Sequence, residues 1–186
     1  MSLHWKLQSF LIFEASVDSG MWSKIEEYFK PYPARWKVAV QLIRQGLAVR
    51  NGSVMSGDME IPAASVARAC GVDRRVVAAT IESIESEESI RNIFEKLEPT
   101  LFLAKAGSAL GYGVLEIEVE NPLAPGIVQE VTSEIASRGI SIRQVVADDP
   151  RFSDPPLLTI ITDQPPPGDL IEAIKAKSGV RQITIR

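Results

Sequence analysis

The fold of the second half of this chain is decided by Gly113-Val-Leu-Glu-Ile-Glu-Val-Glu-Asn-Pro-Leu-Ala-Pro-Gly126. Its first part alternates apolar residues with acidic ones: Leu115, Ile117 and Val119 against Glu116, Glu118 and Glu120. A period of two predicts a β-strand with one buried face and one face in water. The loop from Asn121 to Gly126 then joins this strand to a helix, because the apolar period changes after it.

Beyond this stretch, helical and strand periods follow one another. Four apolar residues share one side of a helix predicted from residue 127 to Gly139. Strands are predicted at 140–147, 157–162 and 180–185, and a second helix around 170–174. The resulting order, β-α-β-β-α-β, is the ferredoxin-like plan.

The first half of the chain predicts helices, a small hairpin and a helix-turn-helix. Asn51-Gly52 is a strong hairpin signal, since both turn residues must tolerate positive φ. Gly71 permits a left-handed stop after one helix, and Asp73 caps the next helix. The chain as a whole is therefore predicted to be α+β, with a helical first domain and a ferredoxin-like second domain.

The domain boundary is expected where the residues are small and rich in glycine, at 104–113. The helix-turn-helix domain is then expected at 21–105 and the second domain at 112–186. Residues 1–20 are expected to form a separate N-terminal extension, because their apolar stretch is too short and too polar for a signal peptide. The functional chain would begin near Met21.

Composition narrows the classes of function. The 186 residues carry a formal net charge of −4, one cysteine (Cys70) and one histidine (His4). This inventory supplies neither a disulfide framework nor a Cys/His metal cluster, and a lone thiol suits a reducing cytoplasm. No apolar run reaches the roughly 20 residues that span a bilayer, so no membrane partner is expected.

Enzymatic readings are disfavoured. A nucleophilic side chain needs a positioned base, and the histidine lies in the N-terminal extension. Asp148, Asp149 and Asp154 could hold a divalent cation, but aspartates before prolines more often start turns. We expect no catalytic residue, metal or cofactor.

The loop from Asn121 to Gly126 is the first candidate for a binding site. It places free N–H groups at the positive end of the following helix, where the carboxylate of an amino acid would find donors. Asn121 offers an acceptor for an ammonium group, and Gly126 allows close approach to the backbone. The alternative is a tight strand–helix connection without a ligand.

The second domain resembles the ACT domain of amino-acid-regulated proteins. The likeness rests on Asn121-Pro-x-x-Pro-Gly126-Ile, on Arg138-Gly139 at the helix end, and on Ile140-Ser-Ile142 entering a strand. The resemblance implies an amino acid site at a homodimer interface, between this loop and the second strand of the partner. Its lining would be Asn121, Leu123, Gly126, Ile127, Ile140, Ser141, Ile142 and Gln144. The family often has Asp where this chain has Asn121.

The helix-turn-helix is the second candidate. Arg74 and Arg75 begin its second helix, where DNA-binding versions of the motif contact bases or phosphates, and we expect Arg68 to join them. Residues 33–81 carry seven basic and three acidic residues, a net charge of +4 within an acidic protein. Such a local excess is the electrostatic footprint of a DNA-binding surface. The alternative is a helical bundle whose arginines are merely solvated.

The stretch from Met21 onward resembles the archaeal predicted regulators of amino acid metabolism, which pair a helical region with a C-terminal ACT domain. The segments that carry the likeness are Gly71-Val-Asp-Arg-Arg-Val-Val77, Leu110-Gly-Tyr-Gly113, Ile140-Ser-Ile-Arg-Gln144 and Leu158-Thr-Ile-Ile-Thr162. The resemblance implies a cytoplasmic homodimer that senses an amino acid or related metabolite and regulates transcription through DNA. The competing interpretation is a regulatory subunit that docks on a biosynthetic enzyme without binding DNA.

Overall fold

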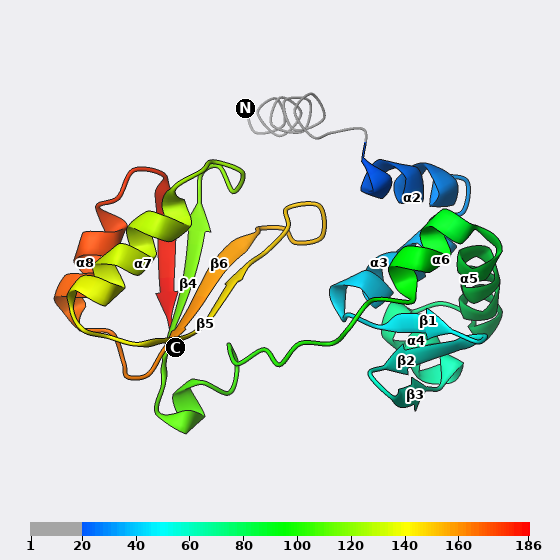
Figure 1. Ribbon diagram of the computed structural model, residues 1–186, viewed down its shortest axis with the longest axis horizontal. Coiled ribbons are helices and arrows are strands. Elements are labelled where there is room, and N and C mark those ends of the chain that lie inside the picture. Colours follow the sequence, from blue (N-terminus) through cyan, green and yellow to red (C-terminus); the bar gives the residue numbers. More distant parts are fainter. Residues whose placement is uncertain (1–19) are drawn as a thin grey trace. The chain divides into compact units, whose positions relative to one another are not determined.

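The computed structural model describes residues 20–186, which form two compact units. The first unit ends at Thr100, and the second runs from Leu101 to Arg186. Each unit has its own antiparallel sheet and its own helices, which confirms the α+β class (Figure 1). The predicted extension, apart from Gly20, lies outside the described residues. Within residues 20–186, no helix combines the length and the apolar character needed to cross a bilayer.

The first unit surrounds a small three-stranded sheet with helices. Its elements in order are α2 (Met21–Phe29), α3 (Pro33–Arg44), β1 (Ala48–Arg50), β2 (Ser53–Ser56), β3 (Met59–Ile61), α4 (Ala63–Cys70), α5 (Arg74–Ser86) and α6 (Glu88–Phe94). The predicted hairpin is confirmed: β1 and β2 pair across Asn51 and Gly52, whose φ angles are 51° and 74°. Gly71 also has the expected left-handed φ, 60°, where α4 ends.

The core of the first unit is built from residues on every helix and on the first two strands. Phe29, Leu42, Ile84 and Phe94 are fully buried within it. Each large side chain removed from such a core costs about 3–5 kcal/mol. This rigid core fixes where α3, α4 and α5 present their exposed residues.

The second unit has the β-α-β-β-α-β order that the sequence predicts. Its elements are β4 (Gly113–Val119), α7 (Ile127–Ser137), β5 (Ile142–Ala147), β6 (Leu157–Thr162), α8 (Gly168–Lys175) and β7 (Val180–Ile185). The strands are antiparallel in the order β5-β6-β4-β7, so β5 lies at one edge of the sheet. The strand expected from residue 140 begins two residues later, because Ile140 and Ser141 connect α7 to it.

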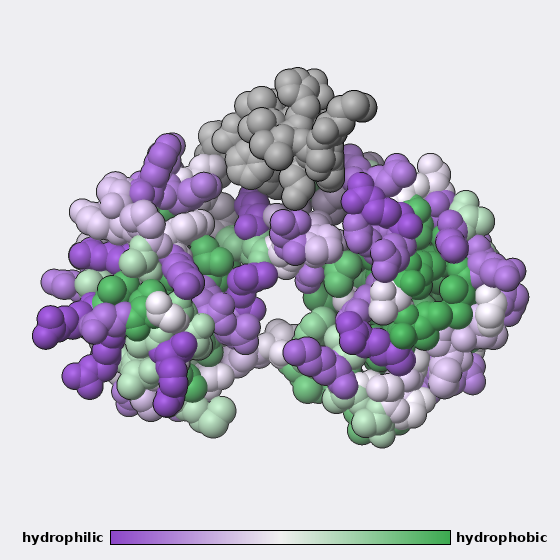
Figure 2. All heavy atoms as spheres, turned by 180° about the vertical axis from the view of Figure 1, so that it is seen from behind, coloured by the Kyte–Doolittle hydropathy of each residue, from purple (hydrophilic) through white to green (hydrophobic). Residues whose placement is uncertain are grey.

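The two faces of this sheet differ. Both helices cover one face (Figure 1), where Leu115 and Ile117 of β4 pack with Val131 of α7 and Leu170 of α8. The other face carries two acidic residues of β4: Glu118 pairs with Arg181 of β7, and Glu116 with Arg186, which directly follows β7, each at 2.9 Å. The view from behind in Figure 2 shows hydrophobic and hydrophilic residues mixed on this unit.

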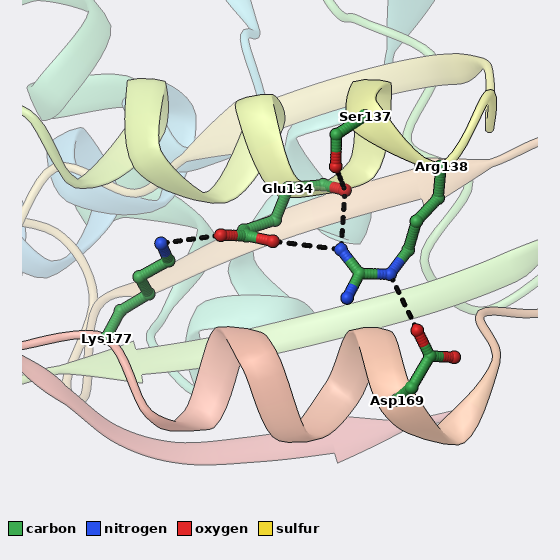
Figure 3. Close-up of polar contacts among 5 residues, drawn as sticks. All are labelled: Glu134, Ser137, Arg138, Asp169 and Lys177. Atoms are coloured by element: carbon green, nitrogen blue, oxygen red, sulfur yellow. Dashed lines mark hydrogen bonds and ion pairs between the residues drawn. The ribbon is translucent and has the colours of Figure 1, made fainter.

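Four charged side chains join α7 to α8 and to the turn after it (Figure 3). Arg138 donates to Glu134 and to Asp169, both at 2.9 Å, and Lys177 bonds the other oxygen of Glu134 at 2.6 Å. The bonds from Lys177 and Arg138 lower the pKa of the Glu134 carboxyl. The bond from Arg138 likewise lowers the pKa of Asp169.

The glycine-rich segment before β4 packs on the second unit. Ala104 is buried together with Val114 and Ile161, on the sheet face that the helices leave open. A Cβ on Gly107 would lie 2.6 Å from a methyl group of Val114, so the small residues here allow close packing. Residues 101–105, expected in the first domain, therefore belong to the second unit, and the boundary lies at Thr100–Leu101.

Candidate functional site

The loop between β4 and α7 has a defined local structure. The Asn121 carboxamide oxygen accepts the N–H of Leu123 at 3.1 Å, and the Asn121 carbonyl accepts the N–H of Ala124 at 3.1 Å. Gly126 is the N-cap of α7 with φ 101°, a conformation that any other residue would adopt only with strain. The turn therefore fixes the direction in which α7 leaves the sheet.

A cavity of about 120 Å³ lies beneath this loop. Of the predicted residues, Asn121 and Ile127 line it, and the carboxylate-bearing residues Glu120 and Glu130 line it as well. Val119, Ala124, Pro125, Ser178 and Gly179 complete the wall. Drug-sized ligands occupy pockets of about 300–1,000 Å³, so this cavity has room for only a small group.

The turn at Ser178 and Gly179 was not anticipated from the sequence. Gly179 reaches the cavity because its carbonyl accepts the N–H of Glu120 at 2.8 Å, as β7 begins to pair with β4. Contact between residues about sixty positions apart depends on this strand pairing. No local sequence pattern around residue 178 signals it.

The predicted strand residues have other partners in this chain. Ile140 is 6% exposed and Ile142 packs against the same core. Ser141 donates its N–H to the Asp163 carboxylate at 3.2 Å, and its carbonyl accepts the N–H of Asp163. The Gln144 side chain accepts the N–H of Leu103 at 3.1 Å and donates to the carbonyl of Leu101. The Gln144 carboxamide, expected to line a ligand site, thus bonds the segment that enters this unit.

The two halves of the predicted ligand site lie at opposite ends of the sheet. Ile142 pairs with Thr162, which in turn pairs with Gly113 at the start of β4, whereas the loop follows Val119 at its end. Six residues of strand separate these levels, which is about 20 Å. Leu123, on the loop, is half exposed. One chain therefore does not bring the loop and the strand together, and a shared site requires a second chain.

The three predicted DNA-contacting arginines are all exposed. Arg74 and Arg75 are the first residues of α5, and the Asp73 carboxylate accepts the N–H of Arg75 at 2.8 Å, which confirms the predicted cap. Arg68 lies on α4 and donates to the hydroxyl of Ser65 at 3.4 Å. All three residues therefore lie on the helices that flank the turn between α4 and α5.

Two further basic residues come from α3. Arg35 and Arg75 line one open groove of about 290 Å³ between α3 and α5, together with Tyr32, Pro33, Ala34, Val76 and Ala79. Lys37 is close to the turn: its ammonium nitrogen lies 3.7 Å from where a Cβ of Gly71 would be. Within the described residues, none of the basic side chains around this turn forms an ion pair. No ion pair therefore neutralises their charge, and the acidic residue nearest to the turn in sequence is the capping Asp73.

The C-terminal end of α5 carries acidic residues, in contrast to its basic start. Glu82 and Glu85 line a groove of about 560 Å³ with Gly52, Ala63, Ala78, Ile81 and Ser86. Glu85 also accepts the N–H of Gly52 in the hairpin turn. The exposed side of α5 is therefore basic at its start and acidic towards its end.

The aspartates after β5 serve as turn acceptors. Asp148 accepts the N–H of Leu157 at 3.2 Å, and Asp149 accepts the N–H of Arg151 at 2.9 Å. In the part of the chain that the structure describes, no three acidic, histidine or cysteine side chains group as metal ligands would. Cys70 is buried in the first core, and that burial raises the pKa of its thiol.

No family model matches the chain, and no curated protein matches it. Among solved structures, the chain is similar to a protein named PH0061, with 13% sequence identity and a TM-score of 0.26. That alignment covers 82% of this chain and 88% of the other.

Proposed function

We propose that this protein is a ligand-sensing regulator of amino acid metabolism. An ACT-type module at residues 112–186 would bind an amino acid or related metabolite, and the helix-turn-helix of the first unit would bind DNA. The observation that carries the proposal is the strand order β5-β6-β4-β7 of a β-α-β-β-α-β unit. That topology is the one the sequence resemblance implies.

The cavity beside Gly126 supports the sensing half of the proposal. Its lining combines the first residue of α7, Ile127, whose helix end favours an anionic group, with the carboxylates of Glu120 and Glu130. A free amino acid carries both a carboxylate and an ammonium, so this pairing of donors and acceptors suits it. The acidic pair also offers the negative charge that Asn121 lacks.

The position of β5 supports a homodimer. Its outer edge has no partner strand within residues 20–186, and open edges pair readily with another chain. In a two-fold dimer, the second chain would supply the β5 residues of the site. Within one chain, those residues lie at the opposite end of the sheet from the loop. Two copies would also present two basic surfaces, as DNA half-sites require.

A thermal-shift screen of the standard amino acids tests the sensing half. A ligand at one hundred times its Kd stabilises the folded state by about 2.7 kcal/mol, so the cognate amino acid should raise Tm clearly. The shift should vanish in Gly126→Val, which alters the loop that forms the cavity. A flat screen for the wild-type protein would contradict amino acid sensing.

Retention on duplex DNA tests the regulatory half. Phosphate neutralisation makes affinity fall steeply with salt, and Arg74→Glu with Arg75→Glu should abolish retention. The acidic end of α5 favours a second candidate, a regulatory subunit that docks on an enzyme, because Glu82 and Glu85 would repel DNA phosphates. Absence of wild-type retention even at low salt would leave this second candidate.

A further inference from the structure

The groove between α3 and α5 brings together two arginines that are forty positions apart in the sequence. Arg35 comes from the first turn of α3 and Arg75 from the first turn of α5. The walls between them are apolar, formed by Pro33, Ala34, Val76 and Ala79. Tyr32, at the N-cap of α3, is 49% exposed at the same groove.

The Arg35 side chain is held in one position. Its guanidinium carbon lies 4.4 Å from the centroid of the Tyr32 ring, which attracts the cation through its π face. One guanidinium nitrogen also donates to the Ser83 hydroxyl at 2.9 Å. A guanidinium has five N–H donors, so most of them stay available to a ligand. A held cation loses little conformational entropy when it binds an anion.

The charge around the groove suits a phosphate. Lys37 and Arg74 lie on the same two helices, α3 and α5, and neither forms an ion pair within residues 20–186. The nearby carboxylate of Asp73 is engaged with the N–H of Arg75. A planar guanidinium group can donate two parallel hydrogen bonds to one phosphate. The apolar walls of the groove can contact the carbon atoms of a sugar. An open groove of this kind fits a chain of sugars and phosphates.

We propose that this groove holds the backbone of duplex DNA, with Arg35 and Arg75 on phosphate oxygens and the adjacent sugar against the apolar wall. Tyr32 is then a positioning residue, which acts through Arg35. This assignment rests on the proposed DNA binding of the first unit and extends it from α5 to α3. Because backbone contacts are independent of sequence, the groove adds affinity without specificity.

The test measures the affinity of the full-length protein for a duplex at a series of salt concentrations. Each phosphate contact contributes about 0.9 to the slope of log K against log salt, so Arg35→Gln should lower that slope by about this amount. The loss should be similar for duplexes of unrelated sequence. Arg44→Gln is the matched control, because Arg44 is exposed at the other end of α3, and its slope should equal that of the wild type.

Variants of Tyr32 and Arg35 distinguish the positioning of the Arg35 side chain from its charge. Tyr32→Phe keeps the ring and should bind like the wild type, whereas Tyr32→Ala should weaken binding several-fold with little change in slope. Arg35→Lys keeps the charge and should recover most of the slope. Thermal unfolding of each variant establishes that it is folded before its affinity is compared.

Three results would overturn the assignment. If the wild type binds DNA but Arg35→Gln has an unchanged slope, the groove does not contact the duplex. If Arg35→Gln abolishes binding of a mononucleotide such as AMP while the duplex slope stays the same, the groove is a nucleotide site. If the wild type shows no DNA binding at low salt, both the groove assignment and the proposed DNA function are overturned.

Discussion

The side chain of Gln144 holds Leu103 by accepting its backbone N–H at 3.1 Å. The same carboxamide donates to the carbonyl of Leu101, so it bonds the main chain on both sides of Phe102. Gln144 lies on β5, the edge strand, and Leu101 is the first residue of the second unit. One side chain thus fixes where the chain enters this unit, at the strand expected to meet a ligand.

Replacing Gln144 with Leu should loosen this entry segment. Each hydrogen bond contributes about 0.5–1.5 kcal/mol, so losing both should lower the free energy of unfolding by about 1–3 kcal/mol. The amide of Leu103 should exchange with solvent faster, and protease should cut more readily beside the exposed Leu101 and Phe102. Gln182→Leu, on the opposite edge strand β7, is the control and should leave exchange at Leu103 unchanged.

Substitution at Gly126 should reveal the strain of its left-handed conformation. Gly126→Ala should lower the free energy of unfolding by about 1–3 kcal/mol, because alanine disfavours φ 101°. Gly168→Ala provides the comparison: both sites have open space for a Cβ, but Gly168 lacks a positive φ. Chemical denaturation should show a lower free energy of unfolding for Gly126→Ala and no decrease for Gly168→Ala. Equal effects at both positions would contradict the conformational explanation.

The charged cluster on α7 and α8 should make stability depend on pH in the acid range. The pKa values of Glu134 and Asp169 are lower in the folded state than in the unfolded chain, owing to bonds from Lys177 and Arg138. Their contribution is complete above the unfolded pKa values and is lost as pH falls through the folded ones. Arg138→Gln should therefore lower Tm at neutral pH and flatten its fall on acidification. Lys175→Gln, an exposed cation on α8, should change neither.

Asp73 combines two roles that Asn and Ala substitutions should separate. Asparagine caps helices about as well as aspartate, so Asp73→Asn should change stability little, whereas Asp73→Ala should cost about 0.5–2 kcal/mol. Removing the carboxylate beside Arg74 and Arg75 should tighten DNA binding in Asp73→Asn. Affinity at fixed salt checks this, and unchanged or weaker binding would argue against DNA at this surface.

Local features were predictable from the sequence because neighbouring residues determine them. The alternation from Leu115 to Val119 predicts a half-buried strand, and Asn51-Gly52 predicts the hairpin turn between β1 and β2. Both features depend on the preferences of residues adjacent in the sequence. The Asp73 cap is local in the same way. The element order of the second unit follows from a series of such signals.

Contacts between distant segments were decided by tertiary structure. The glycine-rich stretch predicts a domain boundary, yet Gly107 packs against Val114, where a Cβ would not fit. Arg35 joins Arg75 only once α3 and α5 are packed on a common core, and Gln144 reaches Leu103 only once β5 has paired. Each of these depends on burying apolar surface between segments far apart in the chain, which no short window of sequence records.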